Sequence, residues 1–161
     1  MRHVLAFASL TVLAACVAPS ARPPAPPRPV PVPAPAPAPA PPPPTSSDWR
    51  DWPVTPGNWR YQQAGEGGVA SYGAAGGMAI FSIRCAGDRL VFERTGASGP
   101  LTIRTSSTAR TLTAPSVPAG DPLIDAMGFS RGRFIVETPG APPLVLPAWS
   151  EVLRVAEDCR G

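Results

Sequence analysis

Two arginines in the short glycine-containing segment 130–133, Arg131 and Arg133, are the side chains in this sequence best suited to holding a ligand. A guanidinium group can bind a carboxylate or a phosphate through two parallel hydrogen bonds, so two of them on one turn can clamp a small anion. Trp49 and Trp52 lie near the start of the folded region and can add flat apolar contacts. These four side chains are the candidate binding residues for a small anionic or glycan ligand.

A structural role for the same four residues is the competing interpretation. The arginines could form ion pairs with nearby acids, and the tryptophans could cover an edge of the core where the chain enters the fold. The acidic candidates for such pairs are Asp121, Asp125, Glu137, Glu157 and Asp158.

Paired carboxylates suggest a different chemistry. Asp121 with Asp125, or Glu157 with Asp158, could in principle hydrolyse a glycoside, a reaction that needs only two acids. Acids this close together on a helix are more often caps and solvated faces. We therefore expect no catalytic residue and no enzymatic activity, with a two-carboxylate hydrolase as the least favoured alternative.

The sequence lacks the side chains that most other catalytic sites require. His3 is the only histidine, and all fourteen basic residues are arginine. Once an amino-terminal segment containing His3 is removed, the chain cannot form a Ser-His-Asp triad, a Cys-His pair, a lysine Schiff base or a histidine-bound zinc. No glycine-rich nucleotide-binding motif is present either. We expect no cofactor and no metal site.

The first of three cysteines closes a short export signal. Residues 1–3 are positively charged, residues 4–13 are mostly apolar, and Leu13-Ala14-Ala15 leads into Cys16. The apolar run is shorter than the roughly 20 residues that a membrane-spanning helix needs. Leu13 to Cys16 resembles the lipobox of bacterial lipoproteins.

This resemblance implies that the signal, residues 1–15, is removed and that Cys16 is acylated. Several acyl chains hold a protein stably on a lipid bilayer without a transmembrane helix. Because Val17 rather than an aspartate follows Cys16, analogy with the same family favours the periplasmic face of the outer membrane. The first expected partner is therefore the bilayer itself.

Proline dominates the segment that follows the cysteine. Residues 19–44 hold fifteen of the twenty-five prolines, which prevents a helix or a sheet and favours an extended polyproline II spacer. We expect residues 16–47 to be a disordered tether and residues 48–161 to be one globular domain. From Asp48 onward there are eleven arginines and eleven acids, so this domain is formally neutral. It has no basic footprint for nucleic acid.

The two remaining cysteines are expected to form a disulfide. Cys85 and Cys159 are the only pair left once Cys16 is acylated, and an exported protein meets an oxidising compartment. Two free thiols forming a redox site are the alternative. The spacing is not the Cys-x-x-Cys of redox sites, which favours a structural bond that fixes a C-terminal helix to a central strand.

Short strands separated by turns make up most of the predicted domain. The clearest is 78–85, where Phe81, Ile83 and Cys85 share one face by period-two alternation. Asp121 followed by Pro122 predicts the start of a short helix. The last helix is expected over 148–158. The further expected strands are 59–62, 69–72, 89–94, 101–105, 109–114, 134–137 and 144–146, and the expected buried helical positions are Leu123, Ile124 and Met127, then Trp149, Val152, Leu153 and Ala156.

The predicted fold class is mainly β with some α: a small antiparallel sandwich or partly open barrel with two short helices, one of them C-terminal. This layout over residues 78–161 is faintly similar to the periplasmic β-sandwich of invasion-associated proteins, from which no functional residue carries over. We expect a non-catalytic envelope module that binds another envelope protein or has a structural role. The small-ligand binder and the hydrolase are the alternatives.

Overall fold

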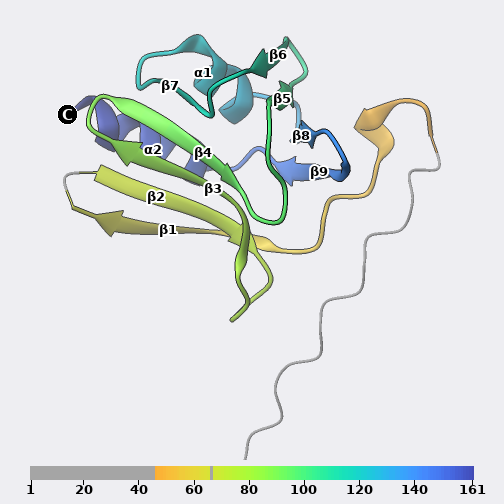
Figure 1. Ribbon diagram of the computed structural model, residues 1–161, viewed down its shortest axis with the longest axis horizontal. Coiled ribbons are helices and arrows are strands. Elements are labelled where there is room, and N and C mark those ends of the chain that lie inside the picture. The colour runs from red at the N-terminus through yellow and green to blue at the C-terminus, as the bar shows by residue number, and fades with distance from the viewer. Residues whose placement is uncertain (1–45, 66) are drawn as a thin grey trace, which may run out of the picture. The chain divides into compact units, whose positions relative to one another are not determined.

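A computed structural model describes residues 46–65 and 67–161 (Figure 1). The export signal, Cys16 and nearly all of the predicted tether lie outside the described residues. The predicted acylation therefore remains a prediction.

The first sheet is antiparallel and has five strands in the order β1-β2-β3-β4-β7. The alternation predicted for its central strand is present, because Phe81 and Ile83 are fully buried. Three neighbouring hairpins connect β1 to β4, and β7 then pairs with the outer edge of β4. The strands are β1 (Asn58–Ala64), β2 (Gly67–Gly73), β3 (Ala79–Ala86), β4 (Arg89–Arg94) and β7 (Ser116–Pro118).

The second sheet is also antiparallel and has four strands in the order β6-β5-β8-β9. Phe134, Ile135 and Val136 are all fully buried in β8, the strand between β5 and β9. The strands are β5 (Leu101–Arg104), β6 (Ala109–Leu112), β8 (Arg133–Thr138) and β9 (Ala141–Pro147).

Two helices complete the described part of the chain. Helix α1 spans Pro122–Gly128, and the Asp121 carboxylate caps it by accepting a hydrogen bond from the Leu123 amide, as the sequence predicts. Helix α2 spans Ser150–Arg160 and packs on the first sheet and on α1 (Figure 1). Within residues 46–65 and 67–161, no helix is long and apolar enough to cross a membrane.

One hydrophobic core joins the sheets and the helices. Trp59 lies within it, with its ring close to Tyr72, Phe81 and Phe134. Its indole N–H donates to the carbonyl oxygen of Pro147 at 2.8 Å, which satisfies the buried donor and connects β1 to β9. The three predicted positions of α1, Leu123, Ile124 and Met127, are buried in this core.

The predicted fold class is confirmed: two antiparallel sheets form a small α+β sandwich with two helices, one at the C-terminal end. The predicted disulfide is also confirmed, since Cys85 of β3 is bonded to Cys159 of α2. It connects the last helix to the middle strand of the first sheet.

Two details differ from the expectation. Strand β7 was not expected, because three residues are too few to show a period. Trp149 was expected in the buried stripe of the last helix, and this is wrong: the helix begins at Ser150 rather than at residue 148, and Trp149 is 44% exposed at its N-cap. Val155 takes its place in the buried stripe beside Val152 and Ala156.

Candidate functional site

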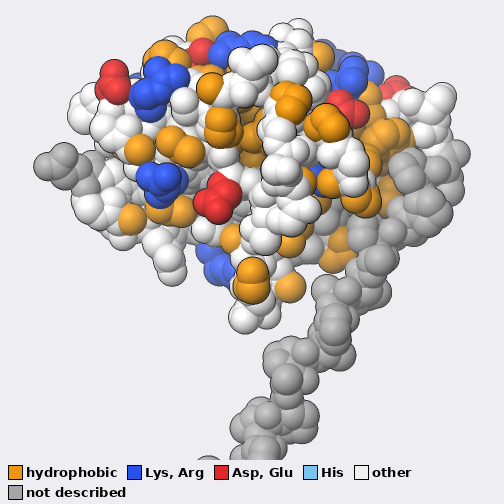
Figure 2. Space-filling model, viewed as in Figure 1, with side chains coloured by type: hydrophobic (Ala, Val, Ile, Leu, Met, Phe, Trp, Pro, Cys, Tyr) orange, Lys and Arg blue, Asp and Glu red, His pale blue; other side chains and the backbone are white. Residues whose placement is uncertain are grey.

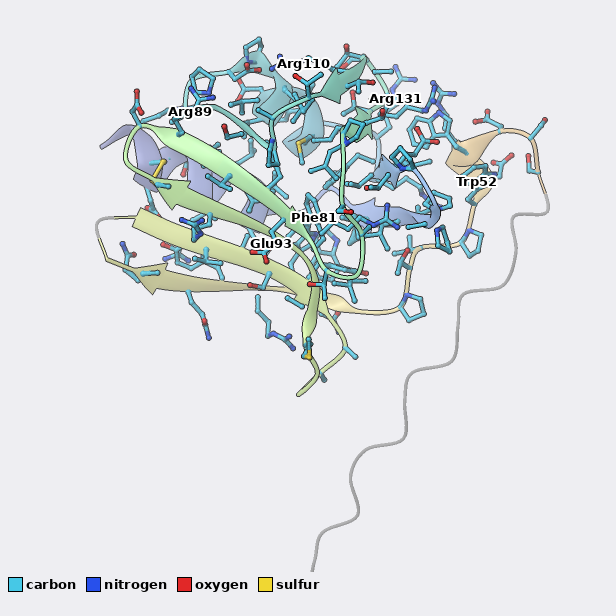
Figure 3. The ribbon with its side chains drawn as sticks, in the orientation of Figure 1. Trp52, Phe81, Arg89, Glu93, Arg110 and Arg131 are labelled. Carbon is cyan, nitrogen blue, oxygen red and sulfur yellow. A yellow bond between two sulfur atoms is a disulfide. The ribbon has the colours of Figure 1, made fainter. Side chains whose placement is uncertain are left out.

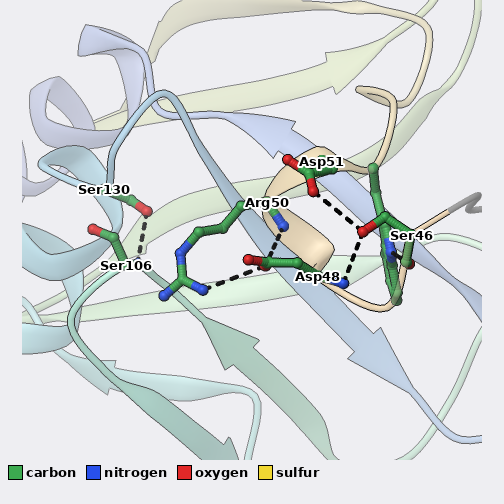
Figure 4. Close-up of polar contacts among 7 residues, drawn as sticks. Ser46, Asp48, Arg50, Asp51, Ser106 and Ser130 are labelled. Carbon is green, nitrogen blue, oxygen red and sulfur yellow. Dashed lines mark hydrogen bonds and ion pairs between the residues drawn. The ribbon is translucent and has the colours of Figure 1, made fainter.

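The described chain begins with a compact turn that contains both candidate tryptophans. A single 3-10 turn spans Trp49–Asp51 (η1), and the Asp48 carboxylate caps it by accepting from the Arg50 amide at 3.0 Å. Asp48 also pairs with the Arg50 guanidinium, and Ser46 bonds to the backbone and side chain of the same segment (Figure 4). The local hydrogen bonds explain why this exposed segment has a defined conformation.

Trp49 and Trp52 are each half-buried on this turn. The Arg50 guanidinium lies over the Trp49 ring, 4.9 Å from its centroid. The Trp52 indole N–H donates to the carbonyl oxygen of Ser46 at 2.7 Å. Each ring therefore has one face or edge occupied by its own segment.

Arg133 and Trp52 are brought together by the fold, although they are 81 positions apart in the sequence. The Arg133 guanidinium donates to the backbone carbonyl oxygen of Trp52 and so fixes the turn against the start of β8. This interaction gives Arg133 a structural role in holding the turn.

Arg131, by contrast, is exposed, and only its backbone is anchored. Its amide donates to the Ser106 hydroxyl at 3.2 Å, while the Ser106 amide donates to the buried Ser130 hydroxyl at 3.0 Å (Figure 4). The positive φ of Gly132, 76°, allows the chain to turn sharply before β8. The backbone is held, and the Arg131 side chain extends from it.

Two exposed aromatic side chains flank the same turn. The Ala148 amide donates to the Gly132 carbonyl oxygen at 3.2 Å, which places Trp149 next to the turn, and Phe129 precedes the turn in sequence. Phe129 is 75% exposed. We call the residues Trp49, Trp52, Phe129, Arg131 and Trp149 the aromatic–arginine surface; Figure 3 labels Trp52 and Arg131 within it.

Among the described residues, Arg131 and Arg133 form no ion pair, and four of the five candidate acids bind other groups. Asp121 holds Arg110 through two bonds of 2.8 Å, and Asp125 pairs with Arg160 at 3.6 Å. The other two pairings are Glu137 with Arg104 and Asp158 with the Tyr61 hydroxyl. The first-sheet face in Figure 2 likewise shows arginines and acids interspersed.

The pairing of Asp121 with Arg110 also affects whether Asp121 could act as the general acid of a glycoside hydrolase. Hydrogen bonds from Arg110 and, less strongly, from the Leu123 amide hold the pKa of Asp121 below its ordinary value of 3.8, although burial acts in the opposite direction. A general acid needs a raised pKa instead. Among the residues that the structure describes, no cluster of acids, cysteines or histidines could hold a metal ion.

Three of the cavities lined by described residues have volumes of about 320, 270 and 270 Å³, and none of the four predicted binding residues lines these three. One, of about 270 Å³, is lined partly by Arg94, which sequence reasoning did not single out. The sequence does contain a pattern that predicts its burial: Arg94 follows Leu90 and Phe92 at the spacing of two residues that marks the buried face of β4.

Comparison of the chain with protein-family models, with curated proteins and with solved structures found no match.

Proposed function

We propose that this protein is a lipid-anchored envelope lipoprotein that presents a small, non-catalytic protein-binding domain on a proline-rich stalk. The lipobox-like Leu13-Ala14-Ala15-Cys16 supports acylation, and the absence of aspartate after Cys16 supports the periplasmic face of the outer membrane. The disulfide between Cys85 and Cys159 supports an oxidising compartment outside the cytoplasm.

The aromatic–arginine surface is the observation that carries protein binding. Phe129 at 75% exposure and Trp149 at 44% are two of the four large exposed hydrophobic side chains of the described residues, and Arg131 lies on the turn between them. Tryptophan and arginine contribute more than other residues to binding energy at protein interfaces. Fixed backbone hydrogen bonds on this turn reduce the entropy that the backbone loses on binding.

Anchoring is tested by replacing the acylation site. In cells fed an alkyne analogue of palmitate, we expect the wild-type protein to be labelled and to sediment with membranes. The Cys16→Ser variant should lose the label and appear in the soluble exported fraction. A labelled Cys16→Ser variant would overturn the proposed anchor.

Partner binding is tested by site-specific photocrosslinking in vivo. A photoreactive side chain at position 129 should capture one discrete envelope protein, and adding Arg131→Ala should abolish the capture. Met78 is the matched control, because it is apolar and 79% exposed but lies at the β2–β3 turn of the first sheet. Equal capture at positions 78 and 129, or capture of lipid alone, would contradict the proposal.

A further inference from the structure

Arg94 is a buried cation between the two sheets. Its side chain is on the inward face of β4, and the residue is only 8% exposed. The guanidinium donates to the carbonyl oxygen of Val136 at 3.1 Å and to that of Pro142. It therefore links the first sheet to β8 and β9 of the second.

Among the described residues, no carboxylate forms an ion pair with Arg94. The ion pairs present there join Arg50, Arg104, Arg110 and Arg160 to acids, and none includes Arg94. A guanidinium has five N–H donors, and the two carbonyl bonds leave three of them. Burial lowers the pKa of Arg94, which reflects the cost of a buried charge without a counter-ion.

A cavity of about 270 Å³ adjoins this cation. Glu93, Arg94 and Ser98 are its charged and polar lining residues, and Phe92, Leu101 and Pro115 are among its apolar ones. Gly99 has a φ of 110° and Gly96 a φ of 76°, values that glycine adopts readily and that let the 95–100 loop fold over the strand end. The lining thus combines one cation and one carboxylate with polar and apolar surface in similar amounts.

The size and charge of the cavity restrict what fits. Pockets for drug-sized ligands are about 300 to 1,000 Å³, so the occupant must be smaller. Glu93 also lines the cavity and is exposed, and its negative charge repels a dianion such as phosphate about twice as strongly as it repels a monoanion. A carboxylate with a short apolar tail meets both restrictions, since one charge can face Arg94 and the tail can contact Phe92 and Leu101.

We propose that the cavity lined by Phe92, Arg94, Ala97, Ser98 and Leu101 binds a small monocarboxylate, with Arg94 as the counter-ion. This site is independent of the acyl anchor and of the aromatic–arginine surface, because it shares no residue with either. It gives the domain a small-ligand function that goes beyond protein binding.

The direct test is a nuclear magnetic resonance titration of the purified full-length protein, labelled with 15N, with butyrate as the probe. We expect saturable shifts of the backbone amides of Ala97, Ser98 and Gly99. Butyramide, which has the same shape without the charge, should bind at least about tenfold more weakly, as should inorganic phosphate. Absence of saturable shifts with butyrate, or equal binding of butyrate and butyramide, would overturn the proposal.

Two variants separate binding from folding. Arg94→Met should abolish the butyrate shifts, but it also removes two buried hydrogen bonds and could unfold the protein. Ala97→Phe keeps Arg94 and fills the cavity, so it should abolish binding while the wild-type pattern of distant amide signals is retained. Butyrate shifts that persist in folded Ala97→Phe would place the bound carboxylate elsewhere and reject this cavity as its site.

Discussion

Arg133 donates a hydrogen bond to the backbone carbonyl oxygen of Trp52, and this contact attaches the first described turn to the second sheet. It joins two residues that the sequence suggests as binding residues, yet it gives them a structural role. Arg131, two positions earlier, has an exposed side chain. The two arginines of one short segment therefore differ in what they do.

The first prediction uses this difference. Arg133→Met should lower the free energy of unfolding by about 1 kcal/mol, because a charged hydrogen bond is lost but the Trp52 carbonyl can be hydrated. Arg131→Met should change it by less than about 0.5 kcal/mol, as is usual for an exposed position. Urea unfolding measures both values. Trypsin cleavage after Arg50 should also become faster in Arg133→Met, and equal effects of the two substitutions would contradict the structural role of Arg133.

The second prediction concerns the disulfide. Cys85 and Cys159 are 74 positions apart, and a loop of this length is expected to stabilise the fold by about 4 to 5 kcal/mol through the entropy of the unfolded chain. Urea unfolding with and without a reductant measures this difference, in a Cys16→Ser background that removes the third thiol. The Cys85→Ala/Cys159→Ala variant is the control and should not respond to the reductant. If the reductant also left the free energy of unfolding of the chain with both cysteines unchanged, the disulfide would not stabilise the fold.

Local signals in the sequence were sufficient for most of the fold. Phe81 and Ile83 alternate with polar residues, and both are buried in β3. Asp121 followed by Pro122 sets the start of α1 through bonds that span only a few residues. Such patterns depend on neighbours in sequence, which is why they can be read without the structure. Trp149 shows the limit, because α2 begins at Ser150, two residues later than expected, which leaves Trp149 at the N-cap and on the surface instead of in the core.

The candidate sites depend on contacts that no local pattern contains. Arg133 reaches Trp52 across 81 residues, and Arg94 reaches Val136 and Pro142 across 42 and 48. A buried arginine on an apolar strand face could be suspected from its period, but which carbonyls it meets depends on how the two sheets pack. The same packing creates the cavity beside Arg94. The residue types in the sequence indicate which side chains can bind an anion. The tertiary structure determines which of these side chains are exposed or line a cavity.

The third prediction is a pH dependence at Asp121. Its pKa is held below the ordinary value of 3.8, first by the hydrogen bonds from Arg110. A carboxyl group whose pKa is lower in the folded state stabilises the fold above its unfolded-state pKa, and this contribution is lost as the pH falls through the folded value. The free energy of unfolding should therefore decrease as the pH falls from about 5 through 3.8 and below.

Asp121→Asn separates this effect from the helix cap. Asparagine caps helices about as well as aspartate, so the capping bond to the Leu123 amide is kept while the charge pairing with Arg110 is removed. Urea unfolding at a series of acidic pH values should show a flatter pH dependence for Asp121→Asn than for the wild type. Parallel curves would contradict the assignment of this dependence to Asp121.

The last prediction concerns the contact between the two helices. A Cβ atom added at Gly128 would lie 2.4 Å from Cγ of Leu153 and within 2.9 Å of both of its methyl carbons. Alanine favours a helix by about 1 kcal/mol over glycine, but overpacking costs about 1 to 3 kcal/mol. We therefore expect Gly128→Ala to lower the free energy of unfolding, by up to about 2 kcal/mol.

Two further variants isolate the steric origin of this effect. Gly120→Ala is the matched control, because a Cβ atom there meets nothing within 4 Å, so it should be neutral or slightly stabilising. In a Leu153→Ala background the clash is gone, and Gly128→Ala should then be stabilising, with a coupling energy of at least about 1 kcal/mol in the double-mutant cycle. If Gly128→Ala had the same effect in both backgrounds, the close approach of α1 to α2 at Leu153 would not be what requires glycine at position 128.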